Sequence, residues 1–242
     1  MRLATVTALA FAGAFTIAQV SAQQPPAGGG QGMGGMNMQD TAHKVPNGGI
    51  RGAGWQGRPD PGSGAVNDSS IDAKGTDLDI HTGPAMLYWN TANKTTGDFT
   101  ITATFTEPKY MSSNDHPHPY GLFVAGNDLD SDKATALYCA VYGNGNVIVR
   151  AFPTAFAPMG NRRPAASAAA HKAAGQGETV TQTVSMSVKG DKVDCSVNGT
   201  SVATLNKADL VGDGKLKSLD GFAGVRVAHN VDVSVKDFKV TK

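Results

Sequence analysis

Two histidines separated by one residue could take part in chemistry. His116 and His118 alternate with prolines in the stretch 112–121. Proline favours extended backbone for itself and for the residue before it, so the two imidazoles should project to the same side. They could hold a metal ion together with Asp115 or Asp128, or present hydrogen-bonding groups to a ligand. In the plainest interpretation, the loop is stiff and its histidines cap neighbouring strands.

Three aspartates follow at alternating positions. The spacing of Asp128, Asp130 and Asp132 resembles the start of a calcium loop. The EF-hand version fails, because its sixth position is Lys133 instead of glycine and its twelfth is Cys139 instead of glutamate. A calcium site of another geometry and a polar turn after a buried strand are the two interpretations. We expect no cofactor, unless this loop binds calcium.

Aromatic rings and one arginine complete the predicted ligand-binding set. Flat rings pack well on the apolar face of a sugar, and an arginine at the end of an apolar strand could anchor a hydroxyl or a carboxylate. The ordinary alternatives are core aromatics and a surface arginine. The predicted ligand-binding residues are His116, His118, Tyr120, Asp128, Tyr142, Arg150 and Trp89.

Short strands must position these residues. In DFTITATFT (98–106) apolar residues alternate strictly with threonines, which is typical of a half-buried antiparallel strand. Turn residues recur every 8 to 12 positions; hairpin turns are expected at 143–146, at Gly190-Asp191 and at Asn198-Gly199. A slip in the apolar alternation predicts a bulge near Lys236-Asp237. About ten such strands favour an all-β fold, a two-sheet antiparallel β-sandwich.

The ends and the composition define the rest of the organisation. Residues 1–22 have the basic start, apolar stretch and small-residue cleavage site of a signal peptide, with cleavage near Ala22. Residues 23–44 form a leader rich in Gly, Gln and Met that we expect to be disordered, and 45–242 form the sandwich domain. We therefore expect a secreted or periplasmic protein. Net charge is +1 with 17% charged residues and no basic cluster, so we expect neither nucleic acid nor membrane as a partner.

The chain has two cysteines, Cys139 and Cys195, each in the apolar phase of a strand-like run. An oxidising compartment favours a disulfide between them. Two buried free thiols would serve equally well as small apolar side chains, so both alternatives stay open.

The C-terminal half resembles the closing hairpins of concanavalin A-like jelly rolls. The resemblance lies in VTQTVSMSVKGDKVDCSVNGTSVATL and in the later GFAGVRVA and VDVSVKDFKVT, and covers about residues 75–242. This part of the chain is especially similar to bacterial domains described as 3-keto-disaccharide hydrolase-like. The catalytic Glu-x-Asp-x-x-Glu motif of related glucanases is absent, since Glu107 and Glu178 are the only glutamates.

Three functions follow as hypotheses. The first is a glycan-associated module that binds carbohydrate. The second, implied by the resemblance, is a hydrolase or lyase acting on keto-disaccharides or related glycosides, with the two histidines as general base or metal ligands. The third is a structural or adhesion domain without a small ligand.

Overall fold

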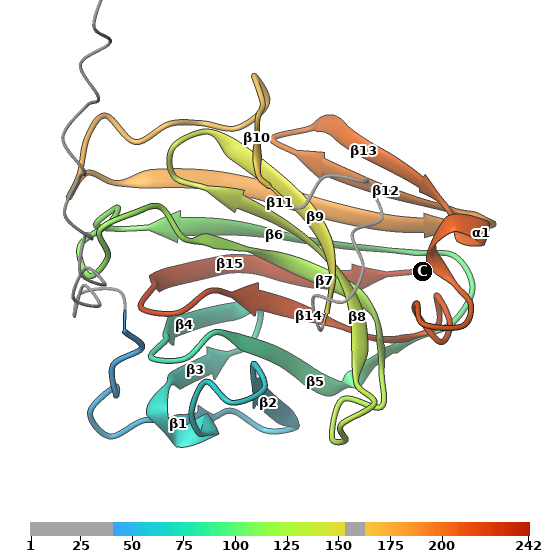
Figure 1. The fold of residues 1–242 in the computed structure, drawn as a ribbon, viewed down its shortest axis with the longest axis horizontal. Coiled ribbons are helices and arrows are strands. Elements are labelled where there is room, and N and C mark those ends of the chain that lie inside the picture. The colour runs from blue at the N-terminus through green and yellow to red at the C-terminus, as the bar shows by residue number, and fades with distance from the viewer. Residues whose placement is uncertain (1–40, 153–162) are drawn as a thin grey trace, which may run out of the picture. The chain divides into compact units, whose positions relative to one another are not determined.

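The alternating strands assemble into two β-sheets, as the sequence predicts (Figure 1). The computed structural model describes residues 41–152 and 163–242, which belong to the unit Met36–Lys242. In spatial order the eight-stranded sheet contains β1 (Gly49–Arg51), β3 (Ser70–Lys74), β4 (Asp77–His81), β15 (Asp232–Thr241), β6 (Phe99–Glu107), β11 (Val180–Lys189), β12 (Lys192–Val197) and β13 (Thr200–Asn206). The seven-stranded sheet contains β10 (Ala165–Ala166), β9 (Asn146–Phe152), β8 (Thr135–Tyr142), β7 (Pro119–Asn127), β14 (Gly221–Val227), β5 (Met86–Thr95) and β2 (Trp55–Pro59).

Both sheets mix strands from distant parts of the sequence. In Figure 1 the red C-terminal strand β15 lies between β4 and β6, and hydrogen bonds join it to both. Neighbouring strands are antiparallel except for the parallel edge pair β1 and β3. Two short helical turns, η1 (Val66–Asp68) and α1 (Lys207–Leu210), complete the described elements. The predicted two-sheet antiparallel sandwich is confirmed.

The core lies between the two sheets. On β6 the residues Phe99, Ile101, Ala103 and Phe105 are buried, and the intervening threonines are partly exposed, as the period of two predicts. Glu107 continues the inward phase, so a carboxyl group is also carried into the interior. Residues of β7 and β8 are buried on both faces of their sheet.

The predicted turns are present. At the β12–β13 hairpin Asn198 and Gly199 have φ values of 49° and 81°, the left-handed backbone that a type I′ turn requires. The β11–β12 hairpin turns at Gly190, with φ 54°. In β15 the pairing register shifts between Lys236 and Lys239, so the bulge expected near Lys236-Asp237 is confirmed.

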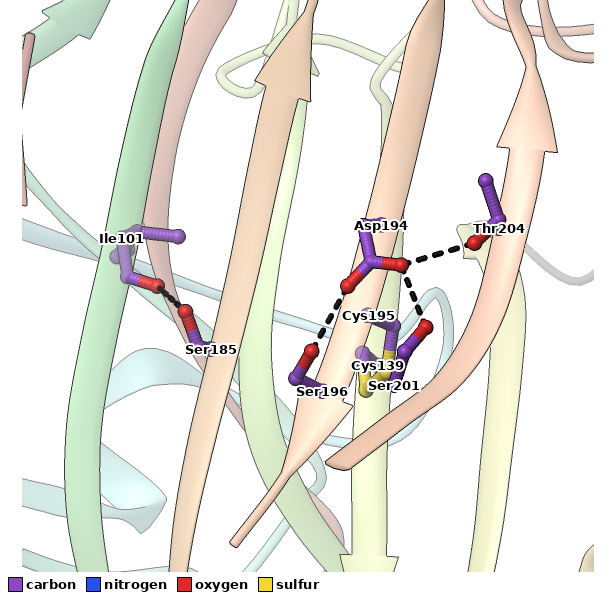
Figure 2. The surroundings of a disulfide bond; sticks show 8 residues. All are labelled: Ile101, Cys139, Ser185, Asp194, Cys195, Ser196, Ser201 and Thr204. Atoms are coloured by element: carbon purple, nitrogen blue, oxygen red, sulfur yellow. Dashed lines mark hydrogen bonds between the residues drawn. A yellow bond between two sulfur atoms is a disulfide. The ribbon is translucent and has the colours of Figure 1, made fainter. Parts of the chain in front are cut away.

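A disulfide crosses the core. Cys139 of β8 and Cys195 of β12 are bonded, with their Cα atoms 6.1 Å apart, so each sheet contributes one cysteine. Figure 2 shows the preceding residue, Asp194, on the opposite side of β12, where its carboxylate accepts hydrogen bonds from Ser196, Ser201 and Thr204. Of the two alternatives that the sequence left open, the structure has the disulfide.

The predicted signal peptide, 1–22, and most of the predicted leader, 23–44, lie outside the described residues. Within the described part, no helix has the length and apolar character needed to cross a membrane.

Candidate functional site

The outer face of the seven-stranded sheet carries a second apolar cluster. Strands β5, β7, β8 and β9 are apolar on both faces, so alternate side chains enter the core while the others point away from the opposite sheet. Residues of the connection between β7 and β8 also pack on this face. The buried members of the cluster are Leu87, Trp89, Phe123, Leu129, Ala134, Ala136, Tyr138, Ala140, Ile148 and Phe152.

A buried ion pair lies on the same face. The guanidinium of Arg226, on β14, donates to both carboxylate oxygens of Asp60 at 2.5 and 2.7 Å. It also lies over the rings of Tyr138 and Phe152, 5.4 and 5.8 Å from their centroids. Such a bidentate geometry fixes the direction of both side chains. Arg226 was not among the predicted site residues, although it lies in GFAGVRVA, one of the stretches that carry the resemblance.

Arg150 and Tyr142 lie near this pair on the same face. Arg150 is directly opposite Tyr138 in the pairing of β9 with β8. The Arg150 Nε atom is buried and has no hydrogen-bond partner among the described residues. Tyr142 packs at the edge of the outer cluster, and its burial raises the pKa of the phenol to about 12. Tyr142 is therefore a neutral hydrogen-bonding group at physiological pH.

Two adjoining grooves open at the end of this face where β2 and β5 meet the β7–β8 connection. They have volumes of about 700 and 470 Å³. Gln56, Trp89, Leu129 and Asp130 line both of them, so the grooves run into one another along Trp89. We name this combined feature the Trp89 groove.

The Trp89 groove has an aromatic wall. The ring of Trp89 lies 6.3 Å from that of Phe222 on β14, and Lys94 Nζ stands 6.0 Å from the Phe222 centroid. Trp89 itself is only 3% exposed, and its indole nitrogen is buried with no hydrogen-bond partner in the described structure. Phe222, which is partly exposed, offers the more accessible ring.

Polar side chains line the rim of the groove. Asp128 forms an ion pair with Lys217 at 2.9 Å, whereas the exposed side chains of Gln56 and Asp130 form no hydrogen bond or ion pair within the described part of the chain. Asp130 and Asp132 line the larger groove. No group of three or more His, Cys, Asp or Glu among residues 41–152 and 163–242 is arranged to hold a metal, so calcium binding by Asp128, Asp130 and Asp132 stays a prediction without geometric support.

The two predicted histidines lie at the other end of β7. They precede Pro119, its first residue, whereas Asp128 follows Asn127, its last. Nine residues of strand separate the two ends by about 30 Å. The expectation that the histidines join Asp128 and Arg150 in one site is therefore wrong. His116 and His118 contact each other instead, with ring centroids 4.5 Å apart.

Tyr120 belongs to the core. It is fully buried between the sheets and stacks on Phe105 with a centroid distance of 5.7 Å. The prediction that Tyr120 contacts a ligand is wrong, because its position on β7 is in the inward phase of the strand. Of the predicted set, Trp89 and Asp128 lie together at the Trp89 groove, and Arg150 and Tyr142 lie elsewhere on the same face.

Of the two glutamates in the sequence, Glu107 has a buried side chain. It is 6% exposed; one oxygen accepts a hydrogen bond from the Met111 backbone N–H at 3.2 Å, and the other has no partner among the described residues. Burial raises the pKa of Glu107 to about 7. Glu178, the other glutamate, is exposed.

No protein-family model matches the chain, and no curated protein matches it. Among solved structures, an endo-1,3-beta-glucanase from Streptomyces sioyaensis superimposes with a TM-score of 0.52 at 13% identity, covering 84% of this chain and 94% of the other. The carbohydrate binding module CBM66 from Bacillus subtilis gives a TM-score of 0.50 at 11% identity, covering 81% of this chain and 99% of the module. At this level of identity the likeness concerns the fold: the chain is a two-sheet jelly-roll sandwich of concanavalin A-like type.

Proposed function

We propose that this protein binds carbohydrate in the Trp89 groove. The observation that carries the proposal is the joining of two grooves along an aromatic wall, with uncommitted polar side chains at the rim. Sugars present apolar faces and several hydroxyl groups, and binding sites for them combine flat rings with a few well-placed polar groups. Phe222 supplies an accessible ring, and Gln56 and Asp130 supply acceptors and a donor for hydroxyls.

The sheet makes the groove rigid. Gln56 is opposite Trp89 in the pairing of β2 with β5, so their positions are set by backbone hydrogen bonds. The opposite wall is held by Arg58, whose guanidinium donates to the backbone oxygens of Leu129, at 2.9 Å, and Ser131. A groove that is already formed loses little conformational entropy when a ligand binds.

A glycan panel that includes a β-1,3-glucan tests the proposal. We expect saturable binding to at least one polysaccharide, weakened about fivefold by Gln56→Ala and by Asp130→Ala, since each removes one hydrogen-bonding group worth about 1 kcal/mol. Asp213→Ala, an exposed aspartate outside the groove, is the matched control. Retention of no glycan contradicts the proposal, and equal binding by all variants places the site elsewhere. Release of product from a glycoside would instead support the hydrolase hypothesis.

We infer further that the protein acts outside the cytoplasm. The signal-peptide pattern of 1–22 supports this, and the Cys139–Cys195 disulfide agrees with it, because disulfides persist mainly in oxidising compartments. Mass spectrometry of the protein from cell fractions should find the chain beginning at Gln23 in the periplasm or medium. An unprocessed chain confined to the cytoplasm would overturn the inference.

A further inference from the structure

Both ring nitrogens of His116 and of His118 make a polar contact. His116 Nδ1 lies 2.7 Å from a carboxylate oxygen of Asp115, and His118 Nδ1 lies 2.8 Å from the backbone oxygen of His229. The two Nε2 atoms then face each other at 3.0 Å. These contacts orient both imidazoles toward one point.

The partners of the Nδ1 atoms determine where the lone pairs are. A carboxylate and a carbonyl oxygen only accept hydrogen bonds, so each Nδ1 must carry the ring proton. In the neutral rings each Nε2 therefore presents a lone pair. A cation shared between the two Nε2 atoms would hold them at such a separation.

We propose that His116 and His118 bind a divalent transition-metal ion, of the kind of Zn²⁺ or Ni²⁺, through their Nε2 atoms. Imidazole is a preferred ligand of these ions. With metal–nitrogen bonds of about 2.1 Å, two ligands at angles between the octahedral and the tetrahedral value have their nitrogens about 3.0 to 3.4 Å apart. The observed separation falls at the start of this range, so little movement is needed.

The outer contacts are those typical of metal-bound histidine. Such a ligand usually donates its second ring N–H to a carboxylate or a backbone oxygen, which fixes the tautomer and the ring orientation. Asp115 serves His116 in this way, and the His229 carbonyl serves His118. The loop is also anchored, because Asn114 Nδ2 donates to the Asn230 backbone oxygen at 2.9 Å.

The site combines a fixed and an accessible ligand. His118 is 5% exposed, whereas the side chain of His116 is 55% exposed. The two histidines are the protein ligands that we propose, and the described residues contain no metal-holding group of three or more His, Cys, Asp or Glu side chains. The ring of His229 lies 4.0 Å from that of His118, which adds a third imidazole to the surroundings.

Isothermal titration calorimetry tests the site on the processed, tag-free protein after treatment with a chelator. We expect one equivalent of Ni²⁺ or Zn²⁺ to bind with a Kd in the micromolar range. His116→Ala should weaken binding at least tenfold, and because His116 is exposed this variant should fold normally. His171→Ala is the matched control, since His171 is an exposed histidine whose Nδ1 also lies 2.8 Å from a backbone oxygen, that of Thr181.

A second variant and two outcomes complete the test. His118→Gln should also lose the site, with circular dichroism checking that the sheets remain. Absence of saturable binding by the wild type would overturn the proposal and indicate that a shared proton balances the two lone pairs. Unchanged affinity of His116→Ala would overturn it as well, by assigning the metal to other residues.

Discussion

Replacing Glu107 by glutamine should make the protein more stable at alkaline pH. The inward phase of β6 carries this carboxyl group into the interior, where one oxygen has a single backbone donor and the other has no partner in the described structure. Burial disfavours the charged form and raises the pKa from its ordinary 4.5 to about 7. Glutamine has nearly the same shape and no charge to bury.

The size of the effect follows from the difference in pKa between the folded and unfolded states. Below pH 4.5 both states are protonated, and the carboxyl group imposes no ionisation cost. Between pH 4.5 and 7 the folded state retains a proton that the unfolded state releases, so stability falls as pH rises. At about 1.4 kcal/mol per pKa unit, the loss at pH 8 is about 3 kcal/mol. Glu107→Gln should therefore equal the wild type near pH 4 and exceed it by about 3 kcal/mol at pH 8.

Urea denaturation of both proteins at pH 4, 6 and 8 measures this difference directly. Glu178→Gln is the matched control, because it changes the other glutamate, which is exposed, and its stability should follow that of the wild type at each pH. A Glu107→Gln variant whose advantage does not grow between pH 4 and pH 8 would refute the reasoning. Such a result would mean that the folded protein solvates or pairs the Glu107 carboxylate.

Three further predictions concern stability. Cys139→Ala/Cys195→Ala should lower the free energy of unfolding by about 4 kcal/mol, the loop-closure entropy for a sequence separation of 56 residues; equal urea midpoints for the double variant and the oxidised wild type would contradict this. The hydrogen bond that His81 Nδ1 donates to the Asp232 carboxylate raises the pKa of His81 to about 9, so its stabilisation is complete below pH 6.5 and disappears as pH rises through 9; an NMR titration should find this value, and a midpoint near 6.5 would disprove the pairing. Asp60→Asn should cost about 3 kcal/mol, because it leaves Arg226 buried without a counter-charge; a loss below about 1 kcal/mol by thermal unfolding would show that water compensates it.

The sequence indicated only part of the candidate glycan-binding site. Trp89 and Asp128 were predicted as ligand contacts and lie at the same groove. Two further groove residues, Gln56 and Phe222, have no distinguishing local pattern. Gln56 is a polar residue in a Gly- and Pro-rich segment, and Phe222 is an apolar residue in a strand. They become neighbours only when β2, β5 and β14 pair. Arg226 had a local signal in its strand pattern, but its partner Asp60 is 166 residues away.

The sequence by itself determined the two-sheet architecture, its hairpin turns and its bulge. These features depend on contacts between near neighbours: alternation defines which face of a strand is apolar, and Asn-Gly tolerates the positive φ of a tight turn. The tertiary structure decided which residues meet. The stacking of the sheets brought Cys139 and Cys195 within bonding distance, and strand pairing brought Gln56, Trp89 and Phe222 to one groove. Such contacts join residues far apart in the chain, and side-chain alternation within a single strand carries no information about which other strand will lie against it.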